Sequence, residues 1–269
     1  EKIFKEKNID IVFHAAAYKH VNIVQSNPVQ GILNNVFSTL NICVKAKENN
    51  LKKVILISTD KAVNPTNIMG ASKRLCEMII QAFSQENEGK DINKGQTIFS
   101  KVRFGNVLGS SGSVVPLFKK QLSEGGPITL TNKNVVRYFM TINEAVQLVI
   151  QASALAMGGD LFLLNMGKSV KIYDLAIKMI RLSGLTVKDK NNPNGDIEIV
   201  ITGLRPGEKL YEELLIDAKA KKTNHPKIFR AMEKYIKLNI LMDKLNELED
   251  SLNNNNFEEL ILKIKEIVP

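Results

Sequence analysis

The sequence predicts an α/β protein with a doubly wound parallel sheet, a smaller second lobe and a pair of terminal helices. Three observations carry this prediction. Short apolar runs such as "IDIVFHAA" and "KKVILIST" are typical of strands that are buried on both faces. Helical patterns separate these runs, and the connections between them are short. Strand–helix–strand units with short connections form parallel sheets with right-handed crossovers.

The first half of the chain supplies three strands and two long helices. One helix begins near Pro28, because proline suits the first turn, and it runs through "VQGILNNVFSTLNICVKAKENN". After the strand "KKVILIST" we expect a helix over about residues 70–86 and then a strand in "GQTIFSKVRFGNV".

The second half changes character. Thr141 and Glu144 form a capping box in "TINE", which predicts a helix that ends near Met157. "DLFLLNMG" is a further strand, and "YDLAIKMIRLSG" is an amphipathic helix that ends at Gly184. A polar loop over residues 184–196 precedes the strand "IEIVITG", the motif "LRPGEKLYEEL" and a lysine-rich linker into two terminal helices.

Composition indicates a globular protein with a sizeable core, since 44% of the 269 residues are apolar and 24% are charged. The net charge of +9 would suit an anionic partner. However, the lysines are spread along the chain and lack interleaved aromatic residues, so we expect no nucleic-acid binding. A solvated lysine-rich surface or an anionic substrate accounts for the charge instead.

Cysteines and histidines form no metal or disulfide pattern. Cys43 and Cys76 lie in apolar helical patterns, which is typical of small core residues in a reducing compartment. His14, His20 and His225 form no cluster, so no metal is expected. We find no signal peptide, and the most apolar helical stretch, "AVQLVIQASALAM", is too short to span a bilayer. These features predict a cytoplasmic chain.

A dinucleotide-binding sheet normally carries a G-x-G-x-x-G turn after its first strand, and this sequence has none. Gly105, Gly109 and Gly112 are the nearest match, but their spacing is wrong and they follow a late strand. We therefore expect the chain to be a fragment of a longer polypeptide, with the first strands of the sheet missing from it.

Polar residues follow the strand "KKVILIST". Thr59, Asp60 and Lys61 place a hydroxyl, a carboxylate and an ammonium in consecutive positions, at the end of a strand where doubly wound sheets bind ligands. They form a compact acid–base set. The alternative is a turn cap followed by a surface lysine, since "NPTN" shows turn chemistry nearby.

Six motifs in order resemble the extended short-chain dehydrogenases/reductases, and within them the UDP-N-acetylglucosamine 4,6-dehydratases of capsule, O-antigen and protein-glycan synthesis. The motifs are "FHAAAYKHV", "NNVFSTLN", "STDKAVNPTNIMGASK", "RFGNVLGSSGSVVP", "RYFMTINEAVQL" and "LRPGEKLYEEL". This resemblance implies a Rossmann-like core over 1–108 and 138–168, a nucleotide-sugar lobe over 109–137 and 169–216, and a C-terminal helical extension over 217–269.

The resemblance also implies catalytic roles. Met69 stands four residues before Lys73, where many relatives have a tyrosine, so the acid–base chemistry moves to the strand end. Thr59 would hold the carbon-4 hydroxyl, Asp60 would be the general acid and Lys61 the base at carbon 5. Lys73 would bind the nicotinamide ribose.

Cofactor and substrate contacts follow from the same motifs. NAD or NADP, retained during turnover, would contact His14, Ala15, Ala16 and Lys73. Asn35, in the helix behind the site, is expected to be a structural hydrogen-bonder. Seven residues are expected to contact a UDP-sugar: Lys19, Arg103, Asn106, Val114, Arg137, Arg205 and Glu208.

Other functions stay open at this point. A dehydratase that inverts carbon 5 or a 4-epimerase would share these motifs, and Met69 is compatible with a non-catalytic dinucleotide-binding module. The resemblance further suggests a homo-oligomer and a membrane anchor upstream of the fragment.

Overall fold

The computed structural model describes residues 2–86, 96–215, 220–233, 236–254 and 257–268. The chain forms two compact units. The first contains Glu1–Phe104, Leu148–Asn165 and Glu213–Pro269, and the second contains Gly105–Gln147 and Met166–Glu212.

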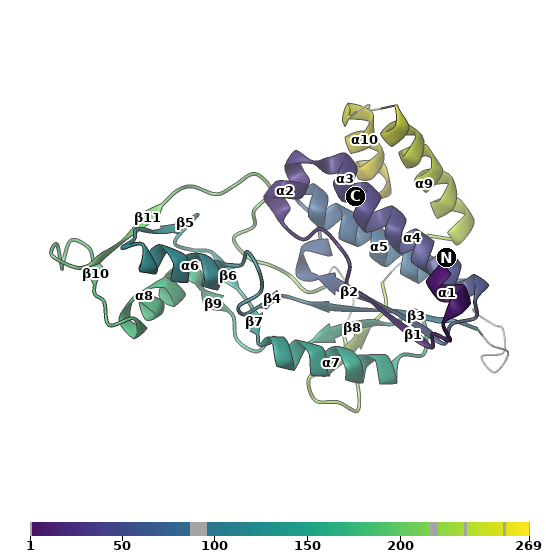
Figure 1. The fold of residues 1–269 in the computed structure, drawn as a ribbon, viewed down its shortest axis with the longest axis horizontal. Coiled ribbons are helices and arrows are strands. Elements are labelled where there is room, and N and C mark those ends of the chain that lie inside the picture. Colours follow the sequence, from purple (N-terminus) through teal and green to yellow (C-terminus); the bar gives the residue numbers. More distant parts are fainter. Residues whose placement is uncertain (1, 87–95, 216–219, 234–235, 255–256, 269) are drawn as a thin grey trace. The chain divides into compact units, whose positions relative to one another are not determined.

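A six-stranded sheet forms the centre of the first unit, in the order β1-β2-β3-β8-β13-β12 (Figure 1). The first four strands in this order run parallel to one another: β1 (Ile11–His14), β2 (Lys53–Thr59), β3 (Ile98–Phe104) and β8 (Leu161–Leu164). Because apolar side chains cover both faces of β2 and β3, these strands are almost entirely buried. The predicted doubly wound parallel sheet is confirmed.

Helices cover both faces of this sheet. On one face lie α2 (Val21–Ser26), α3 (Pro28–Ile32), α4 (Ser38–Glu48) and α5 (Ile68–Gln85), and α7 (Ile142–Leu155) runs along the other (Figure 1). The short helix α1 (Lys2–Glu6) precedes β1. The helix predicted from Pro28 is present, but one π-helical turn, η1 (Leu33–Phe37), interrupts it. Nothing in the amino-acid pattern predicts this turn.

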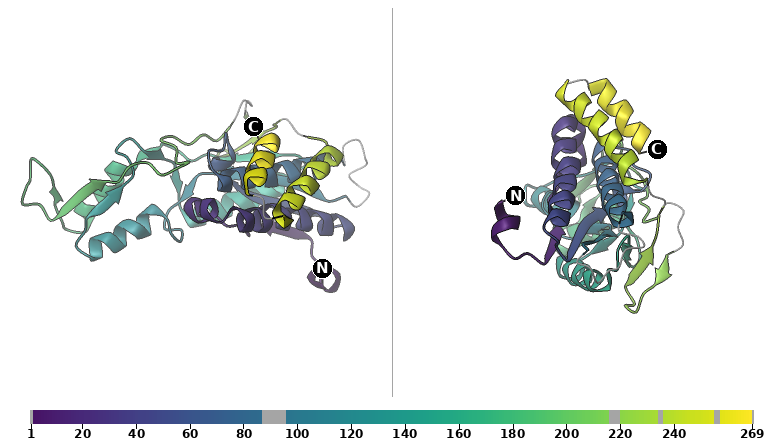
Figure 2. Two further views of the ribbon diagram at one scale, coloured as in Figure 1. Left: turned by 90° about the horizontal axis from the view of Figure 1, so that it is seen from above. Right: turned by 90° about the vertical axis from the view of Figure 1, so that its right-hand side faces the viewer.

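The two terminal helices extend the main core. Apolar residues of α9 (Leu238–Asn253) and α10 (Phe257–Ile267) pack into one cluster with β2, α4 and α5. Figure 2 shows this pair on the side of the sheet opposite α7. The predicted terminal helices are therefore present and belong to the first unit.

The lysine-rich linker contains two strands that the sequence analysis missed. β13 (Ile228–Ala231) pairs antiparallel with β8, and β12 (Lys221–Lys222) pairs with β13. Ile228 and Ala231 are buried, but the strand is only four residues long, contains Arg230 and follows Lys227, so it has no continuous apolar run. The interpretation of this stretch as a linker is wrong, because pairing with β8 outweighs the polar composition.

The second unit contains a three-stranded parallel sheet of β10 (Val187–Lys188), β11 (Ile197–Ile201) and β5 (Ile128–Leu130). Two further pairs are β4 (Asn106–Val107) with β7 (Phe139–Met140), and β6 (Val136–Arg137) with β9 (Val170–Lys171). α6 (Val114–Ser123) and α8 (Ile172–Leu182) close its core.

Two details differ from the predicted elements. The strand predicted to continue through Val107 ends at Phe104, and β4 pairs within the second unit. The strand β10 lies inside the predicted loop 184–196. The units change at residues 104/105, 147/148, 165/166 and 212/213, and the segment 217–269 is part of the first unit.

Candidate functional site

The loop after β1 presents small and basic residues beside a buried ring. Ala15, Ala16 and Lys19 are exposed, so they are accessible to a ligand. His14 is only 3% exposed, and its Nε2 lies 2.8 Å from Oγ1 of Thr39. The Thr39 hydroxyl donates to the carbonyl of Asn35, so the imidazole Nε2 must donate to Thr39.

The hydrogen bond to Thr39 places a proton on Nε2 of His14, and the lowered pKa of the ring keeps it neutral at pH 7. Burial and the neighbouring Lys73 ammonium lower the pKa of His14 from 6.5 to about 4.

Asn35 fixes this loop. Its side-chain oxygen accepts from the amide of Tyr18 at 2.7 Å, and its side-chain nitrogen donates to the Tyr18 carbonyl at 3.0 Å. The same nitrogen donates to Oγ of Ser72 on α5 at 2.9 Å. Asn35 lies in the π-helical turn and is fully buried, so its expected structural role is confirmed. A π turn at such a position is typical of functional regions.

Thr59, Asp60 and Lys61 form one cluster at the carboxyl end of β2. Asp60 begins a short 3-10 turn, and its Oδ1 accepts from Oγ1 of Thr59 and from Nζ of Lys61, both at 2.8 Å. Asp60 is fully buried, whereas 21% of the Lys61 side chain is exposed. Among the described residues, nothing hydrogen-bonds to Oδ2 of Asp60. A buried carboxylate oxygen in this state is suited to a proton or to a ligand hydroxyl.

The start of α5 approaches this cluster closely. Asn67 caps the helix by accepting from the amide of Gly70 at 2.9 Å. A β-carbon at Gly70 would lie 2.3 Å from the carbonyl oxygen of Lys61, so only glycine fits there. Met69 is 3% exposed, and Lys73 donates from Nζ to the carbonyl of Ile57 at 2.6 Å. The helix and the strand end thus bring five predicted residues into one region: Thr59, Asp60, Lys61, Met69 and Lys73.

Arg103 is not accessible to a substrate, which corrects its prediction as a substrate contact. Its side chain is fully buried, and all of its N–H donors bond to Glu77, Glu233 and the carbonyl of Leu214. Sequence reasoning missed this network because Glu233 lies 130 residues away along the chain.

The remaining predicted contacts lie in the second unit. Asn106 belongs to β4, and Val114 is the first residue of α6. Arg137 donates to the carbonyls of Lys209 and Leu210, so it holds the segment after β11. Glu208 accepts from the Thr131 hydroxyl at 2.8 Å.

Arg205 differs from Arg137. It is exposed, and its backbone amide donates to Oε2 of Glu208. Glu208 thus holds the backbone of this loop rather than the guanidinium. Toward the described residues, the Arg205 guanidinium makes no hydrogen bond or ion pair, so it can bind an anion.

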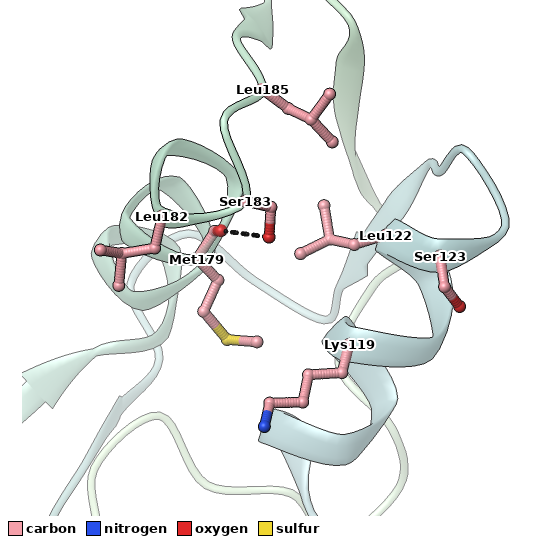
Figure 3. A pocket seen from close by; sticks show the side chains of 7 residues that line it. All are labelled: Lys119, Leu122, Ser123, Met179, Leu182, Ser183 and Leu185. Atoms are coloured by element: carbon pink, nitrogen blue, oxygen red, sulfur yellow. Dashed lines mark hydrogen bonds between the residues drawn. The ribbon is translucent and has the colours of Figure 1, made fainter.

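A separate pocket of about 440 Å³ lies between α6 and α8 (Figure 3). Leu122, Met179 and Leu185 give it mainly apolar walls, with Lys119 at one end. None of the predicted site residues lines it. The candidate site of the first unit is therefore the end of β2 with the start of α5. In the second unit, the exposed Arg205 is a candidate anion contact.

Within the described ranges, no helix has the length and apolar character needed to cross a membrane. Over the same ranges, no group of three or more His, Cys, Asp or Glu residues is arranged to hold a metal ion.

Comparison with known proteins agrees with the sequence motifs. The chain is 50% identical over 256 residues to the capsular polysaccharide biosynthesis protein CapD of Staphylococcus aureus, covering 93% of this chain and 39% of that protein. It is 36% identical to a UDP-N-acetylglucosamine 4,6-dehydratase (inverting) of Campylobacter jejuni, covering 78% and 57%. It is 32% identical to the UDP-glucose 4-epimerase of Rickettsia rickettsii, covering 95% and 74%.

Solved structures show the same fold. The X-ray structure of Pen from Bacillus thuringiensis is 37% identical, with a TM-score of 0.74 over 88% of this chain and 71% of that one. DesIV, a dTDP-glucose 4,6-dehydratase from Streptomyces venezuelae solved with NAD, has a TM-score of 0.63 at 19% identity, over 78% and 66% of the two chains.

The chain spans only part of two relatives that are 50% identical to it, at 39% of CapD and 33% of EpsC from Bacillus subtilis. Residues 1–233 match the family described as "Polysaccharide biosynthesis protein". The chain therefore belongs to the polysaccharide biosynthesis protein family, and its resemblance to extended short-chain dehydrogenases/reductases is confirmed.

Proposed function

We propose that the full-length protein containing this chain is a nucleotide-sugar 4,6-dehydratase. It would convert UDP-N-acetylglucosamine to the UDP-4-keto-6-deoxy sugar for surface polysaccharide or glycan synthesis. The observation that carries the proposal is the cluster of Thr59, Asp60 and Lys61, in which Oδ2 of a fully buried carboxyl group has no hydrogen-bond partner among the described residues.

The residues around β1 and α5 fit a nicotinamide cofactor, NAD or NADP. Ala15 and Ala16 leave room for a flat ligand beside the sheet. After its bond to the carbonyl of Ile57, the Lys73 ammonium keeps two donors that bond to none of the described residues. When bound, the nicotinamide supplies reversible hydride transfer with the sugar ring, which acidifies the proton at carbon 5.

The chain's own residues then complete the elimination of water. Thr59 orients the carbon-4 hydroxyl, whose proton is lost to solvent as the ketone forms. Lys61 takes the proton from carbon 5, and Asp60 gives its proton to the hydroxyl that leaves carbon 6 as water. Carbon 5 regains a proton from solvent as carbon 6 becomes a methyl group. Lys61 and Asp60 already share a 2.8 Å contact, so the proton gained by the base can return to the acid after each turnover. Because Asp60 is fully covered, the substrate reaches it only when a covering side chain moves.

Met69 cannot replace Asp60 or Lys61 in this scheme, because a thioether has no proton to give. In the second unit, the exposed Arg205 is suited to the UDP pyrophosphate, since a guanidinium binds phosphate in a bidentate manner. Asn106, Val114, Arg137 and Glu208 would form the rest of this contact surface.

The experiment uses the full-length protein with UDP-N-acetylglucosamine, and the product is followed by proton NMR. We expect a carbon-6 methyl signal. Asp60→Asn and Lys61→Ala should each lower turnover by at least ~10²-fold, the usual contribution of a general acid or base. Met69→Leu should cost far less, since it changes packing alone.

Lys52→Ala is the matched control, because Lys52 pairs with Asp10 at 3.0 Å on the exposed surface of the same unit. It should leave turnover unchanged. Normal turnover in Lys61→Ala together with an inactive Met69→Leu variant would show that the assigned mechanism is wrong.

The names of two relatives favour two alternative functions. One is a dehydratase that inverts carbon 5, and the other is a 4-epimerase. An epimerase product keeps its carbon-6 hydroxyl and has no methyl signal. An inverting dehydratase gives the methyl signal with altered coupling at carbon 5, so the same spectrum separates all three reactions.

A further inference from the structure

Helix α5 holds the end of β2 at three positions on one helical face. Gly70 packs against the carbonyl of Lys61, Lys73 donates to the carbonyl of Ile57, and Glu77 accepts from Oγ of Ser58 at 2.6 Å. These helix residues follow one another at intervals of three and four, so they face the strand together. The first two belong to the proposed active site, whereas Glu77 has no assigned role.

Glu77 is fixed on its other side by Arg103. Nε and Nη2 of Arg103 donate to the two carboxylate oxygens of Glu77 at 3.0 and 2.6 Å. Nη1 and Nη2 also donate to the two oxygens of Glu233 at 3.0 and 3.2 Å, and Nη1 donates to the carbonyl of Leu214 at 2.9 Å. The guanidinium has no donor left, so its orientation is fully determined.

Carboxylates and guanidinium groups of this cluster pair with one another inside the protein. Arg74 contacts both Glu77 and Glu233, so two arginines face two carboxylates. Burial alone would raise the pKa of Glu77, but Arg103, with Lys101 and Arg74, lowers it to about 2. Glu77 is therefore ionised at neutral pH and is a strong acceptor for the Ser58 hydroxyl.

We propose that Glu77 is a positioning residue, which sets α5 against the end of β2 through Ser58 and is itself held by Arg103 and Glu233. Ser58 immediately precedes Thr59, Asp60 and Lys61, and Glu77 lies one turn after Lys73. The contact thus fixes the strand-end half of the active site relative to its helical half. The positioning contact itself is structural. Its expected effect on catalysis rests on the proposed function.

The cluster also ties a distant part of the chain to the site. Leu214 and Glu233 flank the strands β12 and β13, and both bond to Arg103. The segment after the second unit thereby completes the support of Glu77.

Ser58→Ala in the full-length protein is the sharpest test, because it removes the Ser58–Glu77 contact and leaves every ion pair intact. We expect kcat to fall about tenfold at unchanged KM, below the ~10²-fold that a misplacement of one ångström can cost. Ser58→Thr keeps a hydroxyl and should recover most of the activity. Glu77→Gln should show the same loss of kcat with a lower melting temperature.

Ser100→Ala is the matched control. Ser100 is fully buried on the neighbouring strand β3 and donates to the buried carboxylate of Asp160 at 3.3 Å, away from the end of β2. It should leave kcat unchanged.

Amide hydrogen exchange gives a readout that does not depend on activity. Exchange over residues 59–63 should be faster in Ser58→Ala than in wild type, and unchanged in Ser100→Ala. If wild type forms no dehydratase product, the proposed function fails while this measurement still decides the positioning role. Wild-type exchange and wild-type kcat in Ser58→Ala would overturn the inference.

Discussion

Arg103 in the first unit and Arg205 in the second place a guanidinium in two opposite environments. Arg103 is fully buried, and each of its N–H groups meets an internal acceptor. Arg205 is exposed, and only its backbone amide is bonded to Glu208. The same side chain is part of the scaffold in one unit and available to a ligand in the other.

The difference extends to neighbouring groups. In the first unit, His14, Asn35 and Glu77 have defined partners, whereas Oδ2 of the buried Asp60 has no hydrogen-bond partner among the described residues. In the second unit, the hydroxyl of Ser113 at the start of α6 is buried without a hydrogen-bond partner among the described residues. Polar groups left open in this way are where a ligand is expected.

The largest expected effect is the loss of folding stability in Arg103→Ala. This change leaves Glu77 and Glu233 buried without their main counter-charge, which should lower the free energy of unfolding by about 3–5 kcal/mol. Chemical denaturation of the full-length protein measures it. Arg205→Ala should change the same quantity by less than about 0.5 kcal/mol, as for an exposed side chain. Equal losses in the two variants would remove the distinction between the arginines.

The interior of the first unit should also make stability depend on pH. The folded-state pKa of His14 is lowered to about 4, so its contribution to stability is complete above pH 6.5 and is lost as the pH falls toward 4. At about 1.4 kcal/mol per pH unit, this loss is about 3 kcal/mol. His14→Gln keeps a donor for Thr39 but has no proton to gain.

The measurement is the difference in unfolding free energy between wild type and His14→Gln from pH 7 to pH 4. Contributions from the carboxylates cancel in this difference. A difference that does not change with pH would mean that His14 is accessible to protons in the folded state.

Local pattern was enough to predict the parallel sheet, α5 and the polar strand end, because each depends on residues that are close in sequence. Arg103 shows where this reasoning stops. Its residue type suits an anion, but whether the anion is a substrate or Glu233 depends on a pairing across 130 residues. The strand β13 and the π-helical turn around Asn35 were missed for a similar reason, since pairing with β8 and packing against α5 determine them.

The next expected effect is smaller and concerns ligand binding by Arg205. If its guanidinium binds the pyrophosphate, Arg205→Ala should weaken UDP-sugar binding by about 2 kcal/mol, near the low end for a lost charge pair because the group is exposed. Cofactor content and folding stability should stay at wild-type values. Isothermal titration with UDP measures the change, and unaltered affinity would mean that Arg205 is only solvated.

The smallest expected effect is on the free energy of unfolding, and it distinguishes the first turns of two helices in the second unit. Oγ1 of Thr141 accepts from the amide of Glu144 at 3.2 Å, whereas the Ser113 side chain makes no capping hydrogen bond to α6. Thr141→Ala should therefore lower the free energy of unfolding by about 1 kcal/mol, the usual value of an N-cap. Ser113→Ala should change it by less than about 0.5 kcal/mol, because the mutation removes a hydroxyl that bonds to no described residue. Denaturation of both variants without ligand tests the contrast. A loss of about 1 kcal/mol in Ser113→Ala would mean that this hydroxyl has a partner in the free protein and is not reserved for a ligand.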